Sequence, residues 1–293
     1  MNGEKFEKYE KELRRLEGVD VKISGSSTVT VGHIVVKVSG SGRVSEEEIR
    51  ISGSGRIVGS LQVDRIRTSG SFSCDGDLEI EELSTSGSCA IAGTVKGRSL
   101  RTSGSCRIGQ DLRVSLIQTS GSLSVGGDIV GECLNTSGSL KARDVNVIDC
   151  EIHGSFRLRS IHCKGTFKAE MSGLCNVEEG IRAKDIDIRR APGGKARGFR
   201  VVLFNITLIE VSKGGMRREG ELRTKYIEAE NDVYIENTEC DVIKGRTVII
   251  GPGCTIKKRL EYVESYSIDP TSKVLGKVVK IEELSPTSKE TGK

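Results

Sequence analysis

The tripeptide Ser-Gly-Ser recurs along the chain at a constant spacing. Six copies follow one another with a period of 17 positions, beginning at Ser52, Ser69, Ser86, Ser103, Ser120 and Ser137. Looser copies begin at Ser24 and Ser39. A threonine precedes five of the regular copies: Thr68, Thr85, Thr102, Thr119 and Thr136. A fixed period of this length indicates one structural unit stacked on itself, so it constrains the fold before any local pattern does.

Apolar residues recur in the same register as the motif. Aligned on this period, they form three columns that we expect to face a core: Ile57, Cys74, Ile91, Ile108 and Val125; Leu61, Leu78, Val95, Leu112 and Ile129; and Ile66, Leu83, Leu100, Ile117 and Leu134. Between the columns, apolar and polar residues alternate with a period of two, which is typical of half-buried strands. Glycine columns, one of them inside Ser-Gly-Ser, mark corners that need positive φ or close backbone approach.

These columns predict an all-β fold, a β-solenoid with about 17 residues per rung. Each rung would pair in parallel with its neighbours, about 4.8 Å away. The composition agrees, because only 35% of the residues are hydrophobic and tryptophan is absent. A compact globule of this length would normally bury more large apolar side chains, whereas a thin solenoid core needs only narrow columns.

The sequence divides into five segments. Residues 1–20 predict an amphipathic helix that caps the open solenoid end or binds a partner, and residues 21–188 form the repeat domain. Residues 189–200 form a basic, glycine-rich loop. A second β-rich, solenoid-like part is expected over 201–284, and the polar tail 285–293 is expected to be disordered.

The nine cysteines indicate a core role. Their number is odd, they include no Cys-x-x-Cys pair, and several replace Leu, Ile or Phe in the repeat, so we expect small core hydrophobes in a reducing compartment. Candidate metal ligands are Cys150, His153, His162 and Cys163, but their spacing matches no standard zinc pattern. We therefore expect neither a metal nor a cofactor.

Charge and hydropathy bear on partners and location. The formal net charge of +4 is too small to favour a nucleic-acid partner. No stretch approaches the roughly 18 apolar residues of a membrane span, and the N-terminus lacks the pattern of a signal peptide. We expect a cytoplasmic protein. Peripheral association with the inner face of the membrane stays open, although no clear anchor supports it.

Two features make the chain resemble the bactofilins, polymer-forming cytoskeletal β-helix proteins. The first is the periodicity over residues 24–188. The second is a set of strings similar to the C-terminal part of longer bactofilin-like proteins: Tyr226–Glu230, Val233–Thr238 and Val248–Cys254. The resemblance implies a right-handed parallel β-helix that self-assembles end to end without nucleotide. Unlike the common short bactofilin, this chain is about twice as long and lacks a short hydrophobic N-terminal anchor.

The predicted function is a non-enzymatic scaffold that forms filaments. Its main partner is itself, with cell-envelope or motility proteins as further partners. An uncapped solenoid end presents unpaired backbone donors and acceptors, and a contact that does not close on itself produces a filament. Candidate assembly residues are Val21, Ile23, Val248 and Ile250. The absence of a G-x-x-x-x-G-K-[ST] motif agrees with assembly that needs no nucleotide.

Two other functions stay open. β-Helices also serve as polysaccharide-active enzymes that use carboxylate pairs. Asp77, Asp111 and Asp128 share one column here, but Thr94 interrupts it, and such a row is typical of stabilised turns. The threonine row could instead form a flat array that binds ice or a crystalline polymer. The competing interpretation is that each threonine suits a strand edge while its hydroxyl satisfies the neighbouring corner.

Overall fold

A computed structural model describes residues 15–191, 199–203, 206–211 and 220–284 of the chain. These residues are mostly β-structure, and no helix occurs among them. Residues 15–19, at the end of the predicted helical segment, form a turn and irregular backbone. The rest of that predicted helix lies outside the described residues, as do most of the basic loop and the tail 285–293. Backbone contacts divide the chain into two compact units, Met1–Cys133 and Leu134–Lys293.

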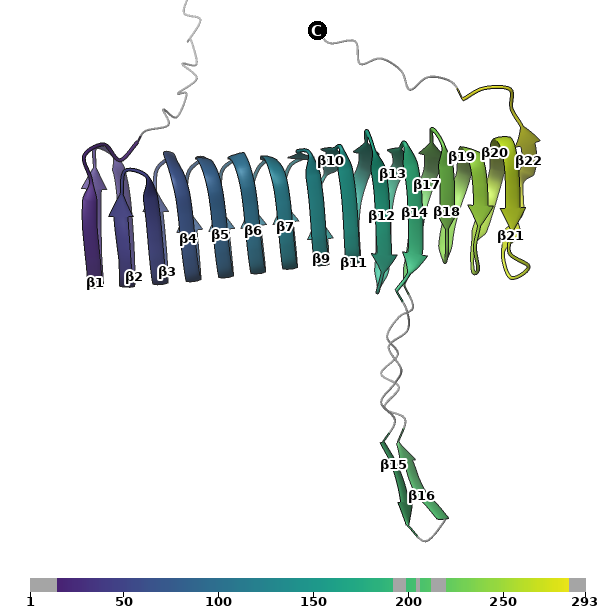
Figure 1. The fold of residues 1–293 in the computed structure, drawn as a ribbon, viewed down its shortest axis with the longest axis horizontal. Helices are drawn as coiled ribbons and strands as arrows, with labels where there is room; N and C mark the ends of the chain where they lie inside the picture. The colour runs from purple at the N-terminus through teal and green to yellow at the C-terminus, as the bar shows by residue number, and fades with distance from the viewer. Residues whose placement is uncertain (1–14, 192–198, 204–205, 212–219, 285–293) are drawn as a thin grey trace, which may run out of the picture. The chain divides into compact units, whose positions relative to one another are not determined.

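Unit 1 is a β-solenoid built from long strands (Figure 1). Its strands are β1 (Asp20–Val31), β2 (Ile34–Ser45), β3 (Glu48–Val58), β4 (Leu61–Cys74), β5 (Leu78–Ile91), β6 (Val95–Ile108), β7 (Leu112–Val125) and β8 (Ile129–Val130). From β3 to β7 the strands pair in parallel, and each residue lies opposite the one 17 positions later. One predicted period therefore corresponds to one rung of the solenoid.

The three predicted apolar columns form the core. Ile57 lies opposite Cys74 and Leu61 opposite Leu78, and the same pairings repeat in the following rungs. Every member of the three columns is at most 3% exposed. A single rung could not bury such a column, whereas a stack covers it from both sides, so the core depends on the stacking itself.

The glycine of Ser-Gly-Ser bends each long strand. Between Gly53 and Gly121, the glycine of each copy has a φ of +124° to +143°, a conformation that residues with a Cβ rarely adopt. A Cβ built on Gly70 would lie 2.2 Å from the carbonyl oxygen of Gly53 in the preceding rung. Glycine is therefore required here both by its backbone conformation and by the close approach of the preceding rung.

The first three strands differ from the predicted parallel coil. β1 pairs with β2, and β2 with β3, in the antiparallel direction. Short connections, one of them containing Gly32 at a φ of +59°, reverse the chain after β1 and β2. Such hairpin turns join antiparallel strands, whereas parallel strands need a longer path. The Ser-Gly-Ser motifs still align, since Gly25 lies opposite Gly40 and Gly40 opposite Gly53.

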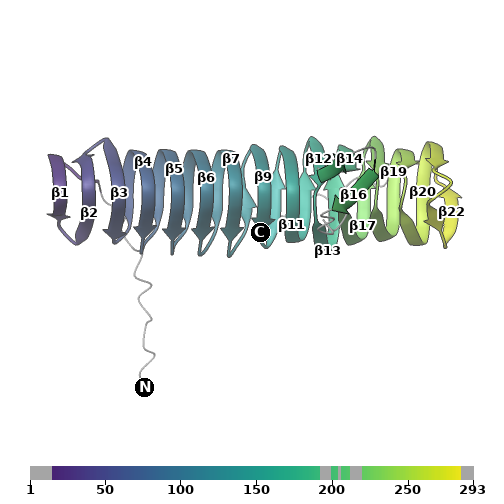
Figure 2. The same ribbon diagram turned by 90° about the horizontal axis from the view of Figure 1, so that it is seen from below.

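Unit 2 is also a stack of parallel strands (Figure 2). The number of residues per rung is less regular than in unit 1. Its strands are β9 (Cys133–Lys141, from Leu134 onward), β10 (Asp144–Val147), β11 (Asp149–Cys163), β12 (Thr166–Met171), β13 (Leu174–Ala183), β14 (Asp185–Arg190), β17 (Glu221–Ala229), β18 (Asp232–Ile235), β19 (Thr238–Ile250), β20 (Thr255–Ile268), β21 (Lys273–Val274) and β22 (Lys277–Lys280). Cys150 lies opposite Phe167, 17 positions later, but Thr166 lies opposite Asp185, 19 positions later. Bulges in β13 and β20, each with one more residue than the partner strand, account for part of this drift.

Within unit 2, strands on either side of the basic segment pair directly with one another. β13 pairs directly with β17, so that Ile181 lies opposite Ile227, and β14 pairs with β18. The intervening residues hold a separate antiparallel sheet of β15 (Phe199–Leu203) and β16 (Ile206–Val211). The residues between β14 and β17 are therefore an insertion between two paired rungs of unit 2.

Charged side chains of unit 2 alternate in sign from rung to rung. Arg182, Glu228, Lys244 and Glu261 occupy successive positions of one register column. The Glu228 carboxylate lies 3.2 Å from Arg182 Nε and 3.5 Å from Lys244 Nζ. Opposite charges on directly paired residues stabilise a sheet, so this column supports the observed register.

Candidate self-association edge

Strand β1 ends the stack of unit 1 with an open edge. Along one side its backbone pairs with β2 over its whole length, from Asp20 opposite Ser45 to Val31 opposite Ile34. Along its other side no strand of the described chain pairs with it (Figure 1). A 12-residue strand with one unpaired edge presents a row of free backbone donors and acceptors, which is a template for a further strand.

Side chains on the inner face hold β1 against the rest of unit 1. Ile23 is 5% exposed, while Val21 is half-buried opposite Val44. At the start of the strand, Arg43 donates two hydrogen bonds of 2.8 Å to the Asp20 carboxylate, and this interaction lowers the pKa of Asp20. The predicted assembly residues Val21 and Ile23 therefore lie in the edge strand, where they anchor it rather than project from it.

Gly25, at the centre of β1, leaves space on the open side. Its φ is +98°, and a Cβ built on it would meet no atom within 4 Å. The next glycines in the column are enclosed: a Cβ on Gly40 would lie 2.2 Å from the Ser52 carbonyl oxygen, and one on Gly53 would lie 2.3 Å from that of Ser39. The difference indicates that Gly25 lacks the neighbouring strand that the other two glycines have.

The sequence contains a signal for this edge that the regular period does not convey. The first three Ser-Gly-Ser copies begin at Ser24, Ser39 and Ser52, at intervals of 15 and 13 positions instead of 17. Hairpins produce such unequal intervals between motifs that still lie side by side. In an antiparallel pair the interval between opposite residues depends on their distance from the turn, so it need not equal the period of the parallel rungs. Gly25 could therefore have been assigned to a terminal hairpin strand.

The other predicted assembly residues lie inside a rung. Val248 and Ile250 are at most 1% exposed in β19, which pairs with β18 on one side and β20 on the other. The last full strand, β20, carries the short strands β21 and β22 on its first half only. Its residues 264–267 are exposed, and Tyr266 packs on Tyr262 at a centroid distance of 4.7 Å. Val248 and Ile250 are thus core residues one rung below this end.

The predicted metal ligands are not brought together. All four lie in β11, but Cys150 and Cys163 are buried while the two histidines lie nearer the surface. His153 Nδ1 is 3.0 Å from Glu170 and Nε2 is 3.1 Å from Glu151. Partial burial opposes a charge on His153, but the hydrogen bonds with these carboxylates outweigh it and raise the pKa of the ring. Within the described ranges, no group of three His, Cys, Asp or Glu side chains is arranged to hold a metal ion.

The cysteines behave as core residues. Eight of the nine are buried, and Cys133 is exposed. Cys89 lies opposite Cys106 in the next rung, and the hydrogen bond between these thiols, with burial, raises the pKa of Cys89. Burial raises the pKa of Cys175 to about 12. Thiols with raised pKa values are poor nucleophiles, so the structure supports the predicted packing role.

The threonine row is buried, unlike the exposed array that the surface-binding alternative requires. Its five members are at most 6% exposed, and their Oγ1 atoms have no hydrogen-bond partner among the described residues. Successive side chains of a strand point to opposite faces. The first serine of each Ser-Gly-Ser is exposed, and the threonine directly before it therefore faces the core. The surface-binding alternative loses the exposed row on which it was based. The hydroxyls do not satisfy the neighbouring corner either.

We expect Thr102→Val to raise the free energy of unfolding by about 1 kcal/mol, because valine keeps the shape and removes a buried hydroxyl without a partner. Urea unfolding followed by circular dichroism measures the change. Ser103→Val, at an exposed position of the same strand, provides the control and should change stability little. Destabilisation by Thr102→Val would show instead that the hydroxyl has a bonding role.

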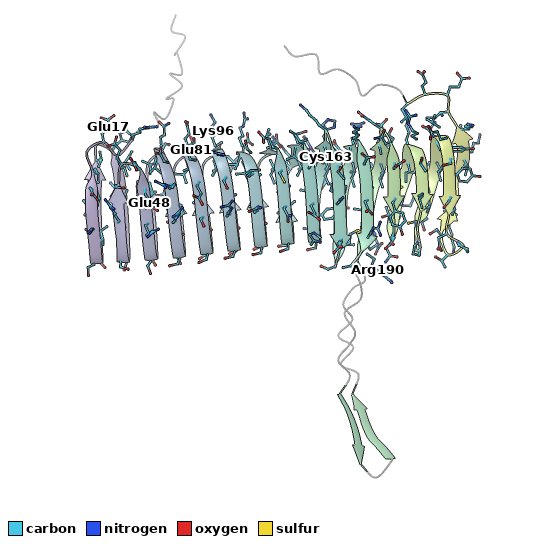
Figure 3. All side chains as sticks on the ribbon, in the orientation of Figure 1. Glu17, Glu48, Glu81, Lys96, Cys163 and Arg190 are labelled. Atoms are coloured by element: carbon cyan, nitrogen blue, oxygen red, sulfur yellow. The ribbon has the colours of Figure 1, made fainter. Side chains whose placement is uncertain are left out.

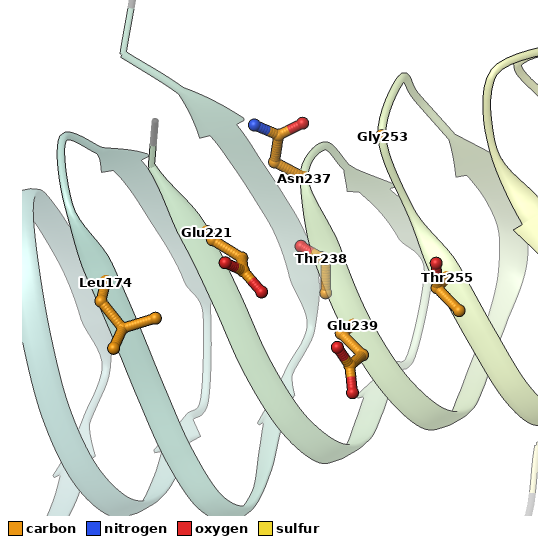
Figure 4. Close-up of a pocket in the computed structure, with 7 residues that line it drawn as sticks. All are labelled: Leu174, Glu221, Asn237, Thr238, Glu239, Gly253 and Thr255. Atoms are coloured by element: carbon orange, nitrogen blue, oxygen red, sulfur yellow. The ribbon is translucent and has the colours of Figure 1, made fainter. Parts of the chain in front are cut away.

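A hollow in unit 2 is lined by two carboxylates, each of which lies beside a cation (Figure 4). Its volume is about 410 Å³, and Glu221 and Glu239 lie in its lining. Arg223 Nε donates to Glu221 at 2.9 Å, and a hydrogen bond from Lys257 lowers the pKa of Glu239. A glycosidase acid needs a raised pKa so that it can donate a proton. The hollow therefore gives no support to polysaccharide cleavage.

The aspartate row stabilises turns, as the sequence indicated. Asp77 accepts a hydrogen bond of 2.7 Å from the backbone N–H of Thr94 in the next rung, and Asp111 accepts one of 3.0 Å from Asp128. The bond from the Asp128 N–H lowers the pKa of Asp111 despite partial burial. These carboxylates are occupied by the backbone of the corners, which is a structural role.

Comparison with known proteins gives a short match. The chain is 45% identical over 58 residues to the uncharacterized protein YhbF of Bacillus subtilis (strain 168), which covers 20% of this chain and 24% of that protein. No family model matches the chain. No solved structure matches it either. The chain thus spans about a quarter of the length of the curated relative in this match, and the relative's name assigns no activity.

Proposed function

We propose that this protein is a non-enzymatic scaffold that self-assembles end to end through the open edge of β1. The observation that carries the proposal is Gly25, a strand-bending glycine of positive φ with open space where the glycines of the next rungs have a neighbouring strand. The resemblance to bactofilins supports assembly without nucleotide. It also supports a cytoplasmic location and the recruitment of cell-envelope or motility proteins. In the described part of the chain, no helix has the length and hydropathy of a membrane span.

The pairing of β2 with β3 supplies a template for the proposed contact between two such edges. In that antiparallel pair Ser39 lies opposite Ser54, Gly40 opposite Gly53 and Ser41 opposite Ser52. The same arrangement between two copies of β1 sets Gly25 opposite Gly25 of the second copy, and Ser24 opposite Ser26. Because the motif is the same in both directions, the contact has two-fold symmetry, and each copy supplies the same backbone edge.

A two-fold contact alone closes into a dimer, so a filament needs a second contact. The exposed residues 264–267 of β20 supply it in this proposal, since β21 and β22 cover only the first half of that strand. Lys273, Lys277 and Lys280 lie in these two short strands, and charged short strands discourage pairing. We therefore expect the β1 contact to form at lower concentration than the β20 contact.

Negative-stain electron microscopy of the full chain without nucleotide tests this function. The proposal predicts particles joined end to end, whose length grows with protein concentration and does not respond to added ATP or GTP. Single particles at every concentration would reject the scaffold proposal. Assembly that requires nucleotide would reject its mechanism.

A further inference from the structure

One face of unit 1 carries cations on four consecutive strands. Lys22 lies opposite Arg43, Arg43 opposite Arg50, and Arg50 opposite Arg67, so the row runs across β1, β2, β3 and β4. Lys22, Arg43 and Arg50 are exposed. Neighbouring strands are about 4.8 Å apart, so the row presents one positive charge per strand along the stacking direction.

Packing does not account for this row. Like charges on directly opposite residues destabilise a sheet. The charged column of unit 2 alternates in sign, which is the arrangement that stabilises strand pairing, whereas this row does not alternate. Nearby carboxylates offset part of the charge: Asp20 is 2.8 Å from Arg43, Glu48 is 3.7 Å from Arg50, and Glu82 is 3.2 Å from Arg67 (Figure 3 labels Glu48). Glu82 also lies 3.6 Å from Arg101, two rungs beyond Arg67. Glu48 lies in the lining of the groove described next, together with the four cations of the row, so that lining has more cations than carboxylates.

The cations line a groove that serine side chains also line. All four border a groove of about 690 Å³, whose lining also includes Ser41, Ser52, Ser69 and Ser86. These serines form their own register row, two positions along each strand from the cation row. Serine hydroxyls and guanidinium groups both donate hydrogen bonds to phosphate oxygens.

We propose that this groove binds a linear polyanion with repeated phosphates and no bases, lying across strands β1–β4. The row of guanidinium groups matches phosphates in charge and geometry. Among the described residues that line the groove there is no tyrosine, tryptophan or phenylalanine, so they offer no platform on which bases could stack. The apolar lining residues Ile23 and Ile51 are buried, so neither is available to enter a membrane.

Binding of fluorescently labelled inorganic polyphosphate, with chains of some tens of phosphates, tests the proposal on the full chain. Arg50→Ser with Arg67→Ser should weaken binding by about tenfold, because two phosphate contacts are lost. The matched control is Arg56→Ser with Arg107→Ser. This control removes the same number of charges, but from strand positions on the other side of the glycine corner. There the residues opposite Arg56 in the next two rungs are uncharged, Ser73 and Ala90. The control should change affinity about twofold or less.

Three results would overturn the proposal. The first is no binding of polyphosphate at low salt, and the second is an equal loss in both double variants, which would show unspecific attraction. The third is tighter, Arg50-dependent binding of single-stranded DNA or anionic vesicles, which would assign another occupant. Circular dichroism verifies that each variant is folded, and Arg50→Ser alone replaces the double variant if that one unfolds. Neither pair of substitutions lies in β1, so the result is independent of the assembly proposal.

Discussion

Gly104→Ala is expected to destabilise unit 1 by about 3 kcal/mol or more, a large share of the stability of an ordinary domain. Gly104 has a φ of +143°, and a Cβ there would lie 2.2 Å from the carbonyl oxygen of Gly87. That atom belongs to the backbone of a stacked rung, so no side-chain movement relieves the overlap. Strain at positive φ adds about 1–2 kcal/mol, and overpacking adds about 1–3 kcal/mol.

Equilibrium urea unfolding of Gly104→Ala beside Ser105→Ala isolates this effect. Ser105 is exposed in the same strand, directly after the glycine, and its substitution should leave the midpoint nearly unchanged. Equal midpoints for the two variants would contradict the requirement for glycine at the corner. The fold would then tolerate a Cβ between rungs, and the close backbone approach of Gly87 would not constrain this position.

Gly25→Ala is expected to weaken association through β1 strongly while leaving the single chain folded. In one copy the added Cβ meets no atom within 4 Å. In the proposed contact it would meet the Ser24 carbonyl oxygen of the second copy, as a Cβ on Gly40 meets the Ser52 carbonyl at 2.2 Å. Sedimentation velocity over a concentration series should show at least about a tenfold rise in the dissociation constant, equivalent to about 1.4 kcal/mol.

Gly18→Ala is the matched control for this variant. Gly18 also has a positive φ, +70°, and a Cβ built on it would likewise meet no atom within 4 Å, but it precedes β1 and is outside the edge. Both substitutions carry a similar backbone strain of about 1–2 kcal/mol. Association lost in Gly25→Ala and kept in Gly18→Ala assigns the contact to β1. Loss in both variants, or in neither, argues against that contact.

The repeat made the architecture predictable because each column of unit 1 reports a position in one rung. A residue such as Leu100 is recognisable as core from its partners one period away, Leu83 and Ile117, before any strand is assigned. The serine–glycine corner and the aspartate turns were predictable for the same reason. Each needs a specific backbone conformation or hydrogen bond that only a few residue types supply.

The remaining features depend on contacts that a period does not contain. Threonine is tolerated at surfaces and in strands, so the burial of Thr102 follows only from the direction of its strand at the glycine bend. The insertion between β14 and β17 hides the pairing of Ile181 with Ile227, which are 46 positions apart. On the open side of Gly25, no strand of the described chain approaches. This is recognised only by comparing Gly25 with Gly40 and Gly53, which are enclosed.

Disulfide trapping between two copies of β1 tests the central claim most directly. Ser24→Cys and Ser26→Cys proteins, each also carrying Cys133→Ser to remove the exposed thiol, are mixed and oxidised mildly with copper phenanthroline. Pairing in the register of β2 with β3 sets Ser24 opposite Ser26 of the second copy, so a covalent dimer should form faster in the mixture than with either variant alone. No cross-linked dimer in the mixture, or equal rates in all three samples, would contradict assembly through this edge.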